Sequence, residues 1–132
     1  AYISVRENSQ FRIDEVKLGE DKAGDVGFFS LLKGGFRAIT GVIGKRERSS
    51  YRVKTTIATI GIRGTDYTAR LCADDCDSEG VVMQGLPQVE NGLYVGVLDG
   101  GVSLVNYGGS LELDRVQYGY VKTANSPPKP LL

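Results

Sequence analysis

The feature that most constrains the fold is the run of residues 53–67, the densest stretch of β-branched side chains in the chain. Such side chains favour strands, but Gly61 and Gly64 interrupt the run, with Arg63 between them. A glycine inside a strand usually marks a bulge, a sharp bend or a close approach of another backbone. The run therefore predicts two strands joined at a bend, with Gly61 and Gly64 as the corner residues.

Arg63 is expected to stabilise this bend. A bend leaves backbone carbonyls without partners, and the guanidinium fork of an arginine can donate to several of them at once. We therefore expect Arg63 to be partly buried and bonded to carbonyls or to Asp66 or Asp99, with the Thr65 hydroxyl in the same network. Because no nucleophile or base accompanies this arginine in the sequence, a structural role is favoured over a catalytic one.

A second pattern also indicates strands with glycine corners. Residues 28–40 and 94–106 align on a Gly-Gly pair, and around it both read apolar, apolar, charged, Gly, Gly, apolar, polar, apolar, apolar, polar. A repeat of this kind is typical of stacked coils or of a pseudo-symmetric sandwich, although two copies also arise by chance.

The fold class follows from these patterns and from a chain with 18 glycines, 4 prolines and no sustained helical period. We expect an all-β domain with a solenoid-like or sandwich arrangement of short strands and glycine corners. The predicted domain spans residues 1–124, and a Pro-rich tail or linker that cannot continue a ladder follows at 125–132. The phase of the apolar pattern slips near Asp14, which predicts a β-bulge there.

The two cysteines, Cys72 and Cys76, lie close together in the sequence. A disulfide between them would close a very small loop, worth roughly 2 kcal/mol in the chain-entropy model. Such a bond is the leading expectation for an oxidising compartment, and two free thiols are the alternative for a reducing one.

Acidic residues follow the second cysteine. Asp75, Asp77 and Glu79 occupy positions 1, 3 and 5 of a segment with glycine at position 6, which resembles the start of a calcium loop. Leu86 stands where a closing bidentate glutamate is needed. A solvated acidic loop is therefore favoured, and a calcium- or glycan-binding surface module using residues 72–80 is the alternative function.

Basic residues form a second charged group, which is expected to be a solvated face. The alternative is a patch for an acidic partner protein or an anionic glycan. Its members are Lys45, Arg46, Arg48, Arg52 and Lys54.

Composition excludes several classes of function. The 16 cationic and 16 anionic side chains balance, whereas nucleic-acid binding needs a clear basic excess. Histidine, the commonest general base, is absent. No phosphate loop, nucleophile elbow or metal-ligand cluster is present, and no apolar run is long enough to span a membrane. We therefore expect no enzyme activity, no cofactor, no nucleic-acid partner and no membrane contact in this segment.

Residues 53–67 resemble the hallmark of the FecR domain family, which is roughly Val-x-Thr-Pro-x-Ala-x-x-Gly-x-Arg-Gly-Thr-x-Phe. Segments 31–37 and 97–104 resemble the family's flanking strands, so the resemblance covers about residues 28 to 122. Thr56 stands where proline is usual, and Tyr67 replaces phenylalanine. The N-terminal part of the family domain is expected to be missing.

This resemblance implies an all-β, non-enzymatic domain in the periplasm or another extracytoplasmic compartment. Family members with a membrane span relay signals from an outer-membrane receptor to a sigma factor, and others stand alone. The expected function is therefore binding of another protein, in transmembrane signalling or sigma-factor regulation, through a sheet edge or residues 72–92. Gly61, Arg63, Gly64 and Thr65 are expected to define the fold rather than an active site.

Overall fold

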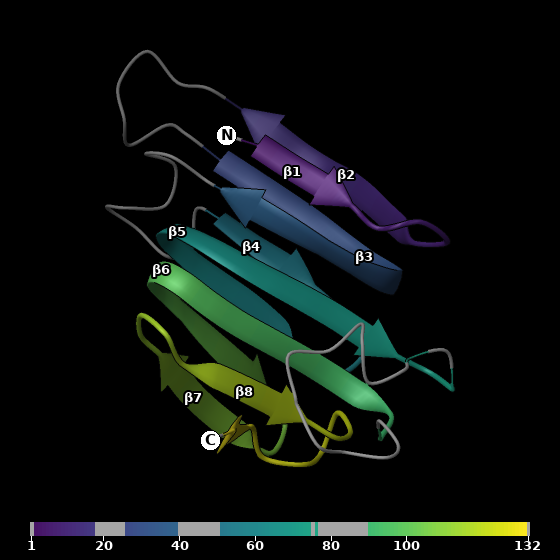
Figure 1. Ribbon diagram of the computed structural model, residues 1–132, viewed down its shortest axis with the longest axis vertical. Coiled ribbons are helices and arrows are strands. Elements are labelled where there is room, and N and C mark those ends of the chain that lie inside the picture. Colours follow the sequence, from purple (N-terminus) through teal and green to yellow (C-terminus); the bar gives the residue numbers. More distant parts are fainter. Residues whose placement is uncertain (1, 18–25, 40–50, 75, 77–89, 132) are drawn as a thin grey trace.

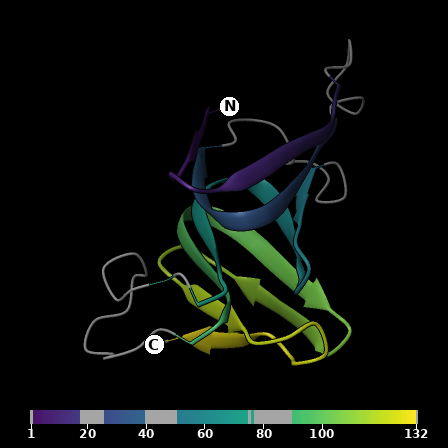
Figure 2. The same cartoon turned by 90° about the vertical axis from the view of Figure 1, so that its right-hand side faces the viewer.

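The computed structural model describes residues 2–17, 26–39, 51–74, 76 and 90–131, and the regular structure in this part of the chain is all β. Its strands form one curled, barrel-like sheet, with β1 and β2 toward one end of the long axis and β7 and β8 toward the other (Figures 1 and 2). The strands are β1 (Tyr2–Val5), β2 (Gln10–Lys17), β3 (Val26–Ile39), β4 (Tyr51–Lys54), β5 (Thr59–Cys72), β6 (Gly92–Asn106), β7 (Gly109–Leu113), β8 (Tyr118–Val121) and β9 (Lys129–Leu131).

Three long strands, β3, β5 and β6, run through both sides of the barrel. The first half of β5 pairs with β4 and with the second half of β6, whereas its second half pairs with the second half of β3 and the first half of β6. The first half of β3 likewise pairs with β2 and β4, and its second half with β1. Each long strand therefore bends near its middle, and the two sides enclose a common core.

Glycines lie at two of these bends. Gly34 in β3 has a φ of 79° and Gly100 in β6 has a φ of 85°, a backbone conformation that glycine adopts without a steric penalty. Each is the first glycine of its Gly-Gly pair. The corner unit that the repeat predicts is therefore present in both strands.

The bend in β5 is confirmed, but Gly61 is not its corner. The register with β6 shifts between Arg63 and Asp66, whereas Gly61 lies in a regular ladder opposite Arg52 and Ser103. A Cβ at Gly61 would lie 2.5 Å from the Ser103 hydroxyl oxygen. Gly61 is therefore needed for the close approach of β6, and the chain turns two residues later.

Each bend also changes which residues face the core. In β5 the side chains that belong to the main core are Ile60 and Ile62 before the bend and Tyr67, Ala69 and Leu71 after it. Because side chains alternate along a strand, an unbroken strand would have turned one of these sets outward. The core-facing positions also change between odd and even numbers at the two Gly-Gly pairs. In β3 the core residues are Phe29 and Leu31 before the pair and Phe36 and Ala38 after it. In β6 they are Leu93, Val95 and Val97 before the pair and Val102 and Leu104 after it.

These observations confirm the all-β class and correct the predicted architecture. Every described strand belongs to a single hydrogen-bonded sheet, ordered β1-β3-β4-β5-β6-β8-β9 with β2 on β3 and β7 on β6. The arrangement is therefore a barrel-like sheet and not a solenoid or a pair of separate sandwich sheets. The physical reason is that strands bent at their corners carry the hydrogen bonding from one side of the core to the other.

The prediction that the Pro-rich C-terminal segment cannot join a ladder is wrong. Residues Lys129–Leu131 form β9, which pairs with β8 and places Pro130 opposite Gly119. Proline is tolerated here because β9 is an edge strand, and an edge strand needs donors on one side only. Strand pairing therefore continues beyond the predicted boundary at residue 124.

Candidate binding groove

Arg63, the central residue of the hallmark, does not have the predicted environment. Its side chain is exposed, and a Cβ at Gly101 of β6 would lie 2.8 Å from its Nη2 atom. The reason is that side chains alternate along a strand. Ile62 faces the core, so the next residue, Arg63, faces outward. Among the described residues its side chain makes no hydrogen bond or ion pair. The exposure of Gly64 and the side chain of Thr65 lie outside the described part.

Thr55 is a hallmark residue with a clear structural role. No role for it was expected from the sequence. Its hydroxyl accepts hydrogen bonds from the backbone N–H groups of Ile57 (3.1 Å) and Ala58 (3.0 Å) and donates to the Ala58 carbonyl (2.8 Å). The Thr55 N–H also donates to that carbonyl at 3.0 Å. This side chain therefore organises the turn between β4 and β5, in the way that threonine hydroxyls do in tight turns.

The cysteine prediction is confirmed in the structure. Cys72 and Cys76 form a disulfide with their Cα atoms 5.5 Å apart. Cys72 is buried in a small cluster with Tyr94, against which Tyr120 and Leu131 pack. The bond therefore lies beside β6, β8 and β9, and not in the main core.

Both ends of the 72–92 insertion are anchored next to this cluster. The Asp74 N–H donates to Asn91 Oδ1 at 2.7 Å, and Asn91 Nδ2 donates to Asp74 Oδ1 at 3.0 Å. The Tyr94 hydroxyl donates to the Glu90 carbonyl at 2.7 Å. The insertion therefore leaves the barrel and returns to it at one place.

The calcium candidates Asp75, Asp77 and Glu79 lie outside the described residues. In the described part, no group of three or more acidic or cysteine side chains could hold a metal ion. Nor does that part contain a helix that could cross a membrane.

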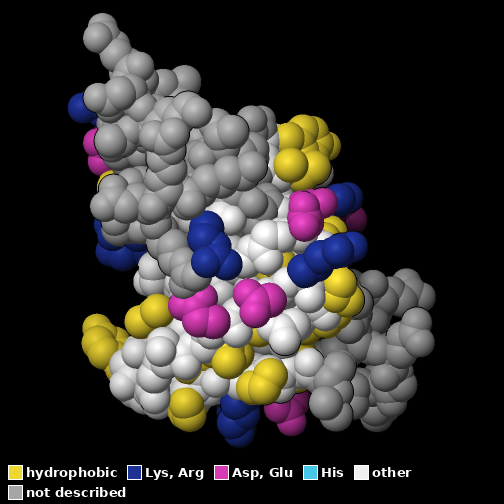
Figure 3. All heavy atoms as spheres, turned by 90° about the vertical axis from the view of Figure 1, so that its left-hand side faces the viewer, with side chains coloured by type: hydrophobic (Ala, Val, Ile, Leu, Met, Phe, Trp, Pro, Cys, Tyr) yellow, Lys and Arg dark blue, Asp and Glu magenta, His cyan; other side chains and the backbone are white. Residues whose placement is uncertain are grey.

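Of the predicted basic group, Lys45, Arg46 and Arg48 also lie outside the described residues. Arg52 and Lys54 lie on the outer face of β4, as the alternation predicts, and the Arg52 guanidinium lies 4.2 Å from the centre of the Phe28 ring. Charged side chains of both signs are intermingled on the face of the molecule in Figure 3, in keeping with the zero net charge.

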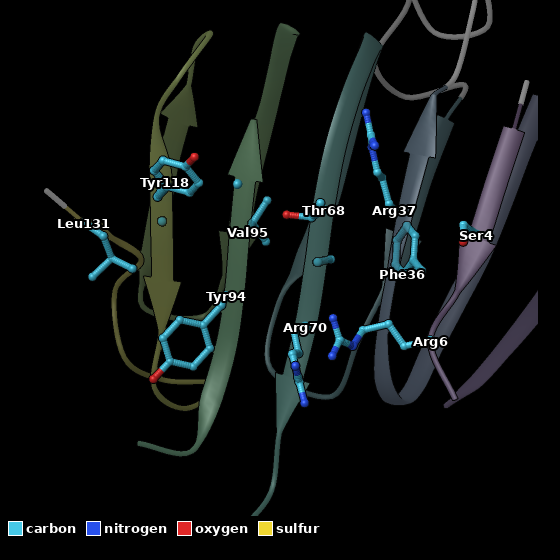
Figure 4. Close-up of a pocket in the computed structure, with 13 residues that line it drawn as sticks. Ser4, Arg6, Phe36, Arg37, Thr68, Arg70, Tyr94, Val95, Tyr118 and Leu131 are labelled. Carbon is cyan, nitrogen blue, oxygen red and sulfur yellow. The ribbon is translucent and has the colours of Figure 1, made fainter. Parts of the chain in front are cut away.

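A groove with a cavity volume of about 320 Å³ crosses the outer surface of the side formed by β1, β3, β5, β6, β8 and β9 (Figure 4). No pattern in the sequence predicts this groove. Its polar and aromatic lining residues include Arg6, Arg37, Arg70, Tyr94 and Tyr118. No carboxylate is among the described residues that line it.

Strand register brings these residues together. Alternate residues share a face of a sheet. Phe36, Ala69 and Val95 also border the groove, but their side chains are buried in the core. One outward row runs across five strands through Arg37, Thr68, Gly96, Tyr118 and Leu131. A second row, two residues along each strand, runs through Gly35, Arg70, Tyr94, Tyr120 and Lys129.

Two glycines, Gly96 in the groove and Gly35 beside it, let neighbouring groups lie close to the sheet. A Cβ at Gly96 would lie 2.6 Å from the Tyr118 ring, and a Cβ at Gly35 would lie 2.8 Å from the Ala69 carbonyl oxygen and 3.1 Å from Arg6 Cδ. Side chains from neighbouring strands therefore lie directly over the backbone at both positions.

The groove has a cationic half and an aromatic half. The cationic half contains Arg6, which follows β1, Arg37 on β3 and Arg70 on β5. The aromatic half contains Tyr94 on β6 and Tyr118 on β8 (Figure 4). One cation is neutralised at the rim, since Arg37 forms a two-point ion pair with Asp66 (3.1 and 2.9 Å). This hydrogen-bonded carboxylate raises the pKa of Arg37. The arginines of the groove therefore lie in one half and its tyrosines in the other.

The chain was also compared with models of known protein families. The model of a family described as FecR protein matches residues 1–103, more than three quarters of the chain. The match includes the hallmark, residues 1–27 upstream of the resemblance and most of β6. Comparison with curated proteins finds no match.

Proposed function

The chain belongs to the FecR family of regulatory and signalling proteins, and we propose that it is a non-enzymatic, extracytoplasmic domain that binds another protein during transmembrane signalling. The observation that carries this proposal is the arginine- and tyrosine-lined groove. Arginine and tyrosine are among the residues most enriched in the well-packed centres of protein interfaces. A concave surface with such a lining fits a binding module better than a purely structural role.

The extracytoplasmic location is supported by the disulfide together with the family. Cys72 and Cys76 form a disulfide. Disulfides persist in oxidising compartments and are rare in cytosolic proteins. Sigma-factor regulation is the form of signalling that we expect if the full protein also carries a membrane span and a cytoplasmic segment.

The nearest approach to a catalytic arrangement in the described part does not favour an enzyme. The Ser30 hydroxyl donates to Asp14 Oδ2 at 2.5 Å, and Arg12 Nε donates to Asp14 Oδ1 at 2.5 Å. These bonds to Ser30 and Arg12 lower the pKa of the Asp14 carboxyl, which makes it a poor base. Asp14 lies at the shift in register between Ile13 and Glu15, so the predicted bulge is confirmed and the cluster holds it in place.

The direct test is capture of a partner from the cell envelope. The purified domain, immobilised on beads, is exposed to periplasmic and membrane extract from the organism that encodes it, and retained proteins are identified by mass spectrometry. We expect a retained envelope protein that free domain competes away. Absence of any competed protein, together with free thiols at Cys72 and Cys76 in native material, would contradict the proposal.

A further inference from the structure

The edge strands of the sheet differ in how well they are protected against pairing with another chain. In the described part of the chain, β1, β2, β7 and β9 each pair with one neighbouring strand. Natural edge strands carry charges, prolines or bulges that block a further strand. β2 has charged side chains and shifts in register, β7 has Glu112, and β9 has Lys129 and Pro130. β1 has no charge, no proline and an unbroken register, so it is the unprotected edge.

The backbone of β1 presents hydrogen-bonding groups along this edge. The Arg6 N–H donates to the Gly35 carbonyl of β3 at 2.9 Å. Residues of an antiparallel strand direct their backbone groups alternately to its two sides. Ser4 therefore also faces β3, whereas the N–H and C=O groups of Ile3 and Val5 face away from it. No described strand lies on that side of β1, so these groups can pair with another backbone.

Apolar side chains are exposed beside these backbone groups. On the outer face, Tyr2 is 59% exposed and lies opposite Ile39 of β3, which is 42% exposed. On the inner face, Ile3 packs against the main core, and Val5 is 44% exposed. A strand added to β1 would cover apolar surface on both faces of the sheet, which is favourable in proportion to the area removed from water.

We propose that β1 pairs with β1 of a second copy of this chain, antiparallel and about a two-fold axis at Ser4. In this register Ile3 of each copy lies opposite Val5 of the other, and the two residues exchange backbone hydrogen bonds. Their side chains lie on the inner face, so they join the apolar rows of the two copies. The two Ser4 side chains face each other at the axis.

Charge complementarity favours a second copy in this register. Arg6 is the one charged residue of segment 2–6. The register places it opposite Tyr2 of the other copy, where a guanidinium is attracted to the face of the ring, and no like charges lie opposite each other within the segment. An axis at Val5 would place Glu7 opposite the apolar Ile3, and an axis at Ile3 would leave Arg6 outside the paired segment.

This pairing extends the groove. Ser4 and Arg6 line the groove at its β1 end (Figure 4). Tyr2 of the second copy lies beside Arg6 in the paired register, so it becomes a lining residue, and the grooves of the two copies meet at the axis. The inference goes beyond the proposed function, because self-pairing of β1 does not depend on any other protein.

Sedimentation and hydrogen exchange test the pairing in the parent chain. We expect analytical ultracentrifugation to show a dimer whose fraction rises with protein concentration from the micromolar to the millimolar range. Exchange at the Ile3 and Val5 N–H groups should slow as the dimer forms, because these groups then have acceptors. Exchange at the Ser4 N–H group should stay constant, because it faces β3 in both states. A parent chain that stays monomeric at millimolar concentration would overturn the inference.

A cysteine at the axis tests the register. Directly opposite residues of a non-hydrogen-bonded antiparallel pair have Cα atoms about 4.5 Å apart, which is within the range of a disulfide. Ser4→Cys should therefore link two copies under mild oxidation. Ser110→Cys is the matched control, since Ser110 is an exposed serine on the edge strand β7, and it should stay unlinked. Equal linking of both variants, or no linking of Ser4→Cys, would contradict the proposed register.

Two lysine variants test the edge itself. Val5→Lys places a charge opposite Ile3 of the second copy and is expected to weaken association about tenfold, the equivalent of about 1.4 kcal/mol. Val105→Lys is the matched control, because Val105 is 49% exposed on β6, between β5 and β7, and it should dimerise like the parent. Dimerisation of Val5→Lys at the level of the parent would overturn the inference.

The same variants separate this inference from the proposed function. If the parent dimerises as expected but captures no envelope protein, the proposed function fails while the pairing of β1 stands. If the parent stays monomeric and Val5→Lys alone loses an envelope partner, the β1 edge binds that partner and not a second copy, so the inference fails while the proposed function stands.

Discussion

Replacing Tyr67 by phenylalanine is expected to stabilise the domain. Its side chain is fully buried and packs edge-on against Phe36, with the ring centres 5.6 Å apart. Its hydroxyl oxygen has no hydrogen-bond partner among the described residues. The same burial raises the pKa of Tyr67 well above its usual value. The FecR hallmark has phenylalanine at this position, so the ring itself suits the site.

The expected gain follows from two opposing effects. A buried polar group without a partner costs about 1–3 kcal/mol, which Tyr67→Phe recovers. Removing the oxygen leaves a void of roughly 10–15 Å³, and at about 24 cal/mol per Å³ this costs about 0.3 kcal/mol. The free energy of unfolding should therefore rise by about 1–2 kcal/mol.

Urea denaturation followed by circular dichroism measures this change. The midpoint should move to higher urea while the slope stays constant, because the surface exposed on unfolding hardly changes. Tyr94→Phe is the matched control. It removes a hydroxyl that donates to the Glu90 carbonyl at 2.7 Å, so it should destabilise the domain by about 0.5–1.5 kcal/mol. If Tyr67→Phe also destabilises the domain, the Tyr67 hydroxyl has a partner and the reasoning is wrong.

Four further outcomes are expected. Thr55→Val should lower the free energy of unfolding by about 1–3 kcal/mol, because it leaves the N–H groups of Ile57 and Ala58 without their acceptor; an unchanged urea midpoint would contradict this. Arg63→Ala should change the free energy of unfolding by less than about 0.5 kcal/mol because the side chain is exposed. A loss above about 1 kcal/mol in the same assay would show that the side chain is a buried, stabilising one. Burial raises the pKa of Tyr51 to about 12, above the value of about 10 in unfolded chains. The neutral Tyr51 side chain therefore contributes fully to the free energy of unfolding below pH about 10, and this contribution declines as the pH rises through about 12. Melting temperatures that stay level across this range would contradict this. Millimolar calcium should leave the melting temperature unchanged if the acidic loop is solvated, whereas a bound ion would raise it.

The bends of the long strands could be predicted because their signal is local. In β5 the main-core positions are even-numbered up to Ile62 and odd-numbered from Tyr67 to Leu71, and the glycine and arginine between them mark the change. The two Gly-Gly pairs give the same signal in β3 and β6. Nearby side chains alone fix such a pattern, so no knowledge of distant partners is needed.

The environment of Arg63 could not be predicted in the same way. An arginine between glycines has the chemistry to serve a bent backbone, and that chemistry suggested burial. Whether it points inward depends on the position of the register shift, which begins after Arg63 and not before it. A difference of one residue in that position reverses the side to which the side chain points.

The sequence by itself determined that the chain is all β, that its long strands bend at defined places, that Cys72 and Cys76 are close enough to pair, and that its family is FecR. These properties depend on residue type and short spacing. Only the tertiary structure decided the barrel-like closure and the groove. Arg6 and Leu131 lie at opposite ends of the chain, and they line one surface because strand pairings between distant segments set the register. Those pairings are the product of folding, and no short stretch of the sequence encodes them.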